Sequence, residues 1–336
     1  MQRRWTASTF VCLCLAVAAL PAQTVTPAQP ATLAEARTLI DAGKPAAAIE
    51  KLRSSDAGDP RIAELLGVAY YHAGDTARAI ETLSAVLPRL AAASAERREA
   101  VQVLGLSHYL AGHIAESIPY LEEIRETGPD DMKLAYALAM AYAQTRQAAK
   151  ARASIARTFK VPEDSASAYL LTGQLMNRLE LEDLAVASLK EALAKDPRLP
   201  EAHFLLGQIA VFRSRLDEGL ALLRAELAIN PAHGMALYWI GEVHSRQAKW
   251  PEAIAALQQS IWINPYFSAP YILLGKAYSK TAQPGTAEEM FRRAIQYDPN
   301  NKTAHYLLGQ LLQQAGRIEE AQKELAIAAR LQGDIK

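Results

Sequence analysis

Paired amphipathic segments run along most of this chain, each with apolar residues at the spacing of one helical face. Near the C-terminus, Leu308, Leu311 and Leu312 belong to the first segment of a pair, and Ala321 and Leu325 belong to the second. Residues three and four apart lie on the same side of an α-helix, so this spacing buries one side and leaves the other in water. The pattern predicts a chain built of helix–turn–helix pairs.

The pairs repeat with a period of 34 residues, which glycine and proline mark. The glycines at this spacing are Gly173, Gly207, Gly241, Gly275 and Gly309, and the prolines are Pro197, Pro231, Pro265 and Pro299. Gly67 precedes Gly105 by 38 residues, which predicts a four-residue insertion near residues 91–95. A fixed period of this length indicates a repeat array, in which each unit buries its apolar faces against the next.

The recurring glycine and proline each have a physical reason. A glycine inside a helix costs about 1 kcal/mol relative to alanine. Seven of eight units keep it, and Ala139 replaces it in the other, so we expect a close backbone approach there. The proline cannot continue a helix and predicts the end of each unit's second helix. Gly74, Gly112 and Gly316 fall in the turn between paired helices, where a positive φ is often needed.

The other positions of the period resemble the tetratricopeptide repeat. In the unit that starts at Ser268, the matching residues are Tyr271, Leu274, Gly275, Tyr278, Ala287, Phe291, Ala294 and Pro299. Units can be placed from about residues 29, 60, 98, 132, 166, 200, 234, 268 and 302, and the first of these is the weakest match. The resemblance implies an all-α, right-handed superhelical solenoid of helix–turn–helix repeats over residues 31–336, with no domain boundary inside it.

One unit carries a charge at a packing position. Glu226 stands at position 27 of the unit that starts at Pro200, where most units have a small or apolar residue. Either the helix is rotated slightly, so that Ala225 takes the packing place, or Glu226 reaches an edge or a partner. We expect the rotated helix.

The N-terminus has the pattern of a secretory signal peptide. Arg3 and Arg4 precede an uncharged apolar run over residues 9–20, and small residues follow up to Ala22. The alternative is a retained membrane anchor, but the run is shorter than the roughly 20 apolar residues that span a bilayer. We expect residues 1–22 to be removed, residues 23–30 to be a flexible linker, and the protein to be periplasmic or secreted, without membrane insertion.

Composition removes several classes of function. The chain has 36 basic and 36 acidic residues, and removal of residues 1–22 leaves 34 basic against 36 acidic, so nothing indicates nucleic-acid binding. Cys12 and Cys14 are the only cysteines and both lie in the expected signal peptide. The mature chain therefore has no disulfide and no thiol chemistry.

Motifs that carry chemistry are missing from the sequence. No phosphate-binding glycine loop, nucleophile elbow or H-E-x-x-H pair occurs. Four of the seven histidines, His108, His203, His244 and His305, fall at core-type positions of the repeat. We therefore expect no catalytic residue, no cofactor and no metal site.

The resemblance implies a binding groove lined by positions 2, 5, 9, 12 and 13 of the first helices. These positions hold aromatic residues beside amides, with cations at one rim, a combination that suits an extended peptide. The candidate groove residues are Tyr136, Gln174, Arg178, Phe204, Gln208, Phe212, Tyr238, Glu242, Arg246, Lys276, Lys280, Tyr306 and Gln310.

These features predict a non-catalytic scaffold that binds a partner protein or an extended peptide in the groove. The alternative is an accessory subunit of an envelope export or assembly machine for polysaccharide or pili, which rests on family analogy. The chaperone-tail clamp of some family members has Lys and Asn where this chain has Phe204 with Gln208 and Tyr238 with Glu242, so that ligand is not expected. The oligomeric state stays open.

Overall fold

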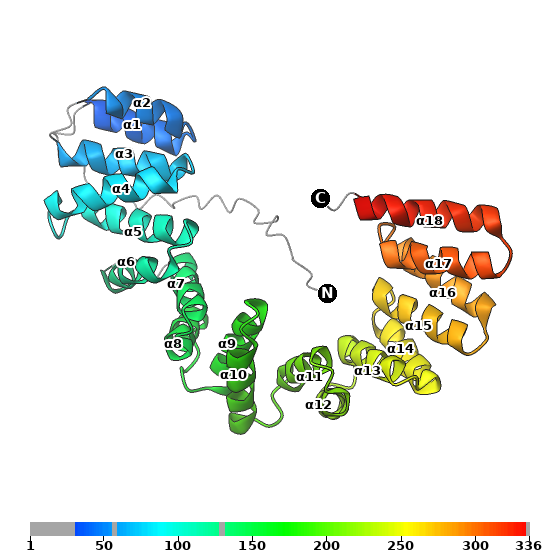
Figure 1. The fold of residues 1–336 in the computed structure, drawn as a ribbon. Coiled ribbons are helices and arrows are strands. Elements are labelled where there is room, and N and C mark those ends of the chain that lie inside the picture. Colours follow the sequence, from blue (N-terminus) through cyan, green and yellow to red (C-terminus); the bar gives the residue numbers. More distant parts are fainter. Residues whose placement is uncertain (1–30, 56–58, 128–131, 334–336) are drawn as a thin grey trace. The chain divides into compact units, whose positions relative to one another are not determined.

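The structure is a computed structural model that describes residues 31–55, 59–127 and 132–333. Within these ranges the chain forms eighteen α-helices, one short 3-10 helix and no strand (Figure 1). The expected all-α repeat architecture is therefore confirmed. The expected signal peptide and linker lie outside the described residues. No helix in the described ranges is long and apolar enough to cross a membrane.

The helices fall into two compact units, α1–α6 and α7–α18, which differs from the single uninterrupted solenoid expected from the period. The first unit contains α1 (Ala31–Asp41), α2 (Pro45–Arg53), α3 (Pro60–His72), α4 (Thr76–Val86), η1 (Leu87–Arg89), α5 (Ala95–Leu110) and α6 (Ile114–Thr127). The predicted insertion falls between η1 and α5, and α5 begins three residues before Arg98, the expected start of its repeat.

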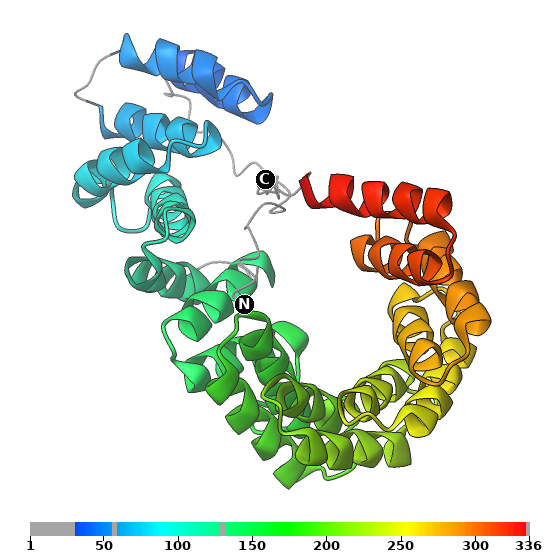
Figure 2. The ribbon, with the colours of Figure 1, turned by 45° about the vertical axis from the view of Figure 1, so that its right-hand side comes forward.

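The second unit holds six helix pairs in sequence (Figures 1 and 2). They are α7 (Met132–Gln144), α8 (Ala148–Phe159), α9 (Ala166–Arg178), α10 (Glu182–Lys195), α11 (Ala202–Phe212), α12 (Leu216–Ile229), α13 (Gly234–Arg246), α14 (Trp250–Ile263), α15 (Ser268–Lys280), α16 (Pro284–Tyr297), α17 (Lys302–Gln314) and α18 (Ile318–Gly333). Each odd-numbered helix packs on the even-numbered helix that follows it and, through that helix, on the next pair. We call the odd-numbered helices first helices and the even-numbered ones second helices.

The recurring glycine sits against the second helix of its own repeat. A Cβ added to Gly275 would lie 2.4 Å from Phe291, and one added to Gly241 would lie 2.5 Å from Leu257. Phe291 and Leu257 both occupy position 24 of their repeats, which is large and apolar throughout. The expected close approach is therefore present, and it is made within the repeat rather than with a neighbouring one.

The turn between paired helices has the same backbone form in all nine repeats. Position 15 has a positive φ in each, between 56° and 81°. Glycine occupies it four times, at Gly43, Gly74, Gly112 and Gly316. The other five turns have Arg146, Glu180, Ser214, Ala248 and Ala282, which adopt the left-handed conformation despite their Cβ atoms. This conformation ends the first helix and reverses the chain.

In three repeats, a histidine or tyrosine side chain at position 4 forms a hydrogen bond to the turn that precedes the repeat. His203 Nε2 lies 3.1 Å from the carbonyl oxygen of Pro197, His305 Nε2 lies 3.0 Å from that of Pro299, and the Tyr271 hydroxyl donates to that of Pro265 over 2.9 Å. Each acceptor is the proline that ends the previous second helix. These histidines therefore have a structural partner in the preceding repeat.

Candidate functional site

The thirteen sequence-predicted groove residues all lie on first helices of the second unit. Tyr136 is on α7, Gln174 and Arg178 on α9, and Phe204, Gln208 and Phe212 on α11. Tyr238, Glu242 and Arg246 follow on α13, Lys276 and Lys280 on α15, and Tyr306 and Gln310 on α17. Among the first helices of this unit, α7 contacts α9, α11 contacts α13, and α13 contacts α15. We call the surface that carries these residues the first-helix face.

Hydrogen bonds join some of these residues across repeats. Arg178 donates to the Tyr136 hydroxyl over 3.2 Å, which links α9 to α7. Arg246 donates to Glu242 over 2.7 Å and to the backbone carbonyl of Val211 over 3.1 Å, which links α13 to α11. The structure therefore brings the predicted residues of neighbouring repeats onto one continuous surface at these points.

The aromatic residues of the first-helix face differ in how much surface they offer. Phe212 is 65 % exposed and Tyr306 is 46 % exposed. Phe204 is buried and packs on the His233 ring, with 4.6 Å between the ring centres. Tyr238 is half-buried against Phe267, at 5.3 Å between ring centres. Phe204 therefore serves mainly in packing, while Phe212 and Tyr306 are available for contact.

The polar residues of this face also divide into paired and open groups. Gln310 donates to the Tyr306 hydroxyl over 2.8 Å, which presents the amide and the ring together. Lys276 and Lys280 are exposed and form no ion pair with any residue in the described ranges. Glu242 is neutralised by Arg246. Within the described residues, the first-helix face therefore carries unpaired positive charge at α15, on Lys276 and Lys280.

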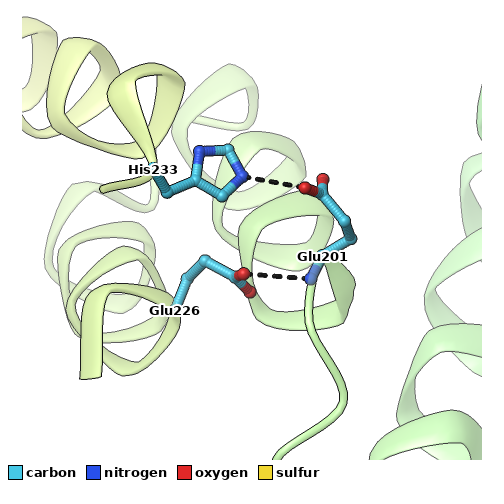
Figure 3. Close-up of side chains that lie close together, drawn as sticks. All are labelled: Glu201, Glu226 and His233. Atoms are coloured by element: carbon cyan, nitrogen blue, oxygen red, sulfur yellow. Dashed lines mark hydrogen bonds and ion pairs between the residues drawn. The ribbon is translucent and has the colours of Figure 1, made fainter. Parts of the chain in front are cut away.

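The expected rotation of α12 around Glu226 is wrong. Glu226 is fully buried, and its two carboxylate oxygens accept the backbone N–H groups of Glu201 over 3.0 Å and Phe204 over 3.2 Å. These donors lie at the start of α11, where the first N–H groups of a helix have no partner within it. A carboxylate also has a favourable interaction with the positive end of the helix. Glu226 is thus an N-terminal cap supplied by the second helix of the same repeat (Figure 3).

His233 completes this arrangement from the next repeat. Its Nδ1 accepts the N–H of Ala236 over 3.2 Å, and its Nε2 faces Glu201 Oε1 at 3.1 Å. A backbone N–H can only donate, so Nδ1 is the acceptor and Nε2 carries the proton. His233 is therefore a neutral imidazole that caps α13 and bonds to Glu201 (Figure 3).

Glu201, Glu226 and His233 place ligand-type atoms within 4.8 Å of one another. The expectation of no converging carboxylates and histidine overlooked this cluster. Its hydrogen bonds nevertheless oppose a metal role: both Glu226 oxygens accept backbone N–H groups, and both His233 nitrogens are engaged. A cation would have to break the caps of α11 and α13 to gain these ligands. The sequence signal that could have located the cluster is the glutamate at position 27.

The first unit has its own buried carboxyl group, at position 5 of its repeat. Glu64 on α3 is buried, and one of its oxygens has no hydrogen-bond partner. Arg37 on α1 forms two hydrogen bonds with Glu99 on α5, at 2.5 and 2.6 Å. Burial, followed by the negative charge of Glu99, raises the pKa of Glu64 well above its usual value. Sequence reasoning did not identify this group, since its neighbours Arg37 and Glu99 lie on two other helices, α1 and α5.

Two family models of the tetratricopeptide repeat match the chain. One matches residues 280–335, and the other matches residues 33–96, 103–165, 136–200, 178–232 and 204–266. These matches cover most of the chain and agree with the helix pairs. The chain belongs to the tetratricopeptide repeat family. It is accordingly a repeat scaffold of the protein-interaction class.

Several solved structures are similar in fold. MamA from Desulfovibrio magneticus RS-1, residues 41 to the end, is 22 % identical over 52 % of this chain and 98 % of that one, with a TM-score of 0.47. YrrB, described as a TPR protein with an unusual peptide-binding site, is 20 % identical over 56 % of this chain and 95 % of that one, with a TM-score of 0.46. A chain of the APC/C hetero-tetramer Cut9–Hcn1 is 18 % identical over 84 % of this chain and 55 % of that one, with a TM-score of 0.46. No curated protein matches the sequence.

Proposed function

We propose that this protein is a non-catalytic scaffold that binds an extended segment of a partner protein along the first-helix face of α7–α17. The observation that carries the proposal is the bond from Arg178 to Tyr136, because it joins predicted contact residues of two repeats into one surface. Exposed Phe212 and Tyr306 offer apolar contact, and the amides beside them can bond to a peptide backbone. An extended peptide offers side chains for apolar contact and backbone groups for hydrogen bonds at regular intervals.

The test is capture of the partner from the envelope fraction by crosslinking. A photo-reactive residue in place of Phe212 or Tyr306 should crosslink a discrete partner. The double variant Tyr238→Ala with Gln208→Ala should weaken that capture while leaving the helical content intact. A matched variant on second helices, Lys190→Ala with Arg224→Ala, removes two exposed side chains from another surface and should leave capture unchanged. Undiminished capture by the Tyr238 and Gln208 variant would remove the proposal.

We also propose that the scaffold acts after export, in the periplasm or outside the cell. The support is the N-terminal pattern of Arg3 and Arg4, the apolar run over residues 9–20 and the small residues before Gln23. N-terminal sequencing of the mature protein should begin near Gln23. A cytosolic protein that starts at Met1 would refute export and leave the binding proposal standing.

A further inference from the structure

A pocket of about 280 Å³ lies beside the Glu201–His233 pair, where three successive inter-repeat turns of the second unit meet. It is lined by Glu201, Asn230, Ala232, His233, Gly234, Met235, Ile263, Asn264 and Phe267. The Phe267 ring in its wall packs on Tyr238, a residue of the first-helix face. Glu201 and Met235 both stand at position 2 of their repeats, so the pocket continues that face at the N-terminal ends of α11 and α13.

The charge of the pocket is negative. Glu201 and His233 are its only ionisable lining residues, and His233 is neutral because its Nδ1 accepts the Ala236 N–H. The Glu201 side chain is 46 % exposed and has no lysine or arginine partner in the described ranges. The N-terminus of α13 and the C-terminus of α14 both border the pocket, and their opposite partial charges offset each other. The full charge on Glu201 therefore sets the sign.

The walls suit a long side chain with a charged end. Met235, Ile263 and Phe267 form an apolar wall, while the Asn230 and Asn264 amides can accept hydrogen bonds. Lysine and arginine bury an aliphatic stem against apolar surface and keep the charged end near polar groups. An acidic or uncharged apolar side chain would match only part of this lining.

We propose that this pocket receives a lysine or arginine side chain of the bound segment, with the stem against Met235 and the cation beside Glu201. This inference rests on the proposed function for the occupant being a polypeptide, and it adds the class of side chain that the scaffold selects. Glu201 then has two tasks: its backbone N–H belongs to the cap formed by Glu226, and its carboxylate faces the ligand.

Methionine methyl NMR can test the pocket by itself. The protein is labelled with ¹³C at its methionine methyl groups, and the probes are acetyl-Ala-Ala-Arg-Ala-Ala-amide and the same peptide with citrulline, which has the shape of arginine without its charge. Met235 reports the pocket, Met140 reports position 9 of α7 on the first-helix face, and fully buried Met176 is the internal reference. The arginine peptide should shift the Met235 signal saturably, with an affinity about fivefold or more above that of citrulline.

The decisive variant is Glu201→Gln, since glutamine keeps an acceptor for His233 and removes the charge. It should lower the affinity for the arginine peptide to that of the citrulline peptide. The matched variant Glu218→Gln, an exposed acid on α12, should bind the arginine peptide as the unchanged protein does. A thermal melt of each variant verifies that the fold is retained.

Three results would overturn the pocket proposal: equal affinity for the two peptides, no movement of the Met235 signal up to about 10 mM peptide, or unchanged binding by Glu201→Gln. These results are separate from those of the capture experiment. A Met235 response combined with undiminished capture by the Tyr238 and Gln208 variant would mean that the pocket stands and the first-helix proposal fails. Reduced capture without a Met235 response would mean the reverse.

Discussion

Two buried glutamates in this protein differ in how many hydrogen bonds their carboxyl groups accept. Glu226 has two backbone N–H donors for its oxygens, whereas one oxygen of Glu64 has no hydrogen-bond partner. A buried carboxylate is stabilised by donated hydrogen bonds, and without enough of them the neutral acid is favoured. The same residue type is therefore a helix cap in one unit and a buried acid with a raised pKa in the other.

Replacing Glu64 with glutamine should change how stability depends on pH. Because the pKa of Glu64 is raised in the folded state, its contribution is fully present below the unfolded pKa of about 4.3 and is lost as pH rises toward the folded pKa. The unfolding free energy of the α1–α6 unit should therefore fall between pH 5 and pH 8, relative to Glu64→Gln, by about 1 kcal/mol or more. Urea unfolding at the two pH values measures the difference.

Glu81→Gln is the matched control for this prediction. Glu81 lies exposed on α4 of the same unit. This variant should follow the pH dependence of the unchanged protein. Parallel stability curves for the protein and Glu64→Gln would show that Glu64 ionises at the same pH in the folded and unfolded states, contrary to its raised pKa.

At the scale of the helix pair, the left-handed turn residue decides how each pair closes. Four repeats have glycine there, and five have residues with a Cβ atom. A residue other than glycine in this conformation carries a penalty of about 1–2 kcal/mol. The helix pair forms in all nine repeats, so packing between the two helices outweighs the strain of the turn.

Ala282→Gly should therefore stabilise the second unit. Relief of the strain at φ 57° exceeds the added freedom of glycine in the unfolded chain, and the expected gain is about 0.5–1 kcal/mol. The control is Ala315→Gly at position 14 of the last repeat, also exposed but at φ −81°. That change should destabilise by a similar amount, and denaturant unfolding compares the two. A loss of stability in Ala282→Gly would contradict the claim that the left-handed backbone at Ala282 is strained.

Gly275→Ala should destabilise the α15–α16 pair. The new Cβ would lie 2.4 Å from Phe291, and overpacking of this kind costs about 1–3 kcal/mol even though alanine favours the helix. Gly285→Ala makes the same change in α16, where nothing lies within 4 Å of the added atom. We expect it to be neutral or slightly stabilising. Equal midpoints for the two variants in thermal unfolding would refute the close approach.

At the scale of the whole molecule, the two compact units are expected to differ in how a single substitution changes their stability. Stability in repeat proteins is close to a sum of repeat and neighbour terms, so a local change acts mainly nearby. Glu226→Ala removes both acceptors of the α11 cap and should cost the second unit about 2–4 kcal/mol.

Hydrogen exchange with mass spectrometry can locate this loss. Amides in α11–α13 should exchange faster in Glu226→Ala, while those in α3–α5 should keep their protection. Glu218→Ala on the same helix α12 is the control, because its exposed side chain pairs with Arg215 at the surface. Faster exchange in both units would show that the chain opens as a single cooperative body.

The 34-residue period predicted the helix pairs well because each pair depends on local features that recur. Gly275 and Pro265, for example, mark a close approach and a helix end with little help from distant residues. The cap by Glu226 was missed because it requires the left-handed backbone of Glu201, 25 residues earlier. The contact of Arg37 with Glu99 joins helices 62 residues apart, a distance that no local pattern reports. The pocket beside Glu201 likewise needs three turns brought together.

The five strained turns also have a consequence for the genetics of this protein. Arg146, Glu180, Ser214, Ala248 and Ala282 each carry a penalty that one substitution by glycine relieves. They lie in separate turns without shared partners, so their gains should add. A selection for restored function after a destabilising lesion such as Glu226→Ala should therefore recover second-site suppressors at these codons. The turns would serve as global suppressor sites that act through stability alone.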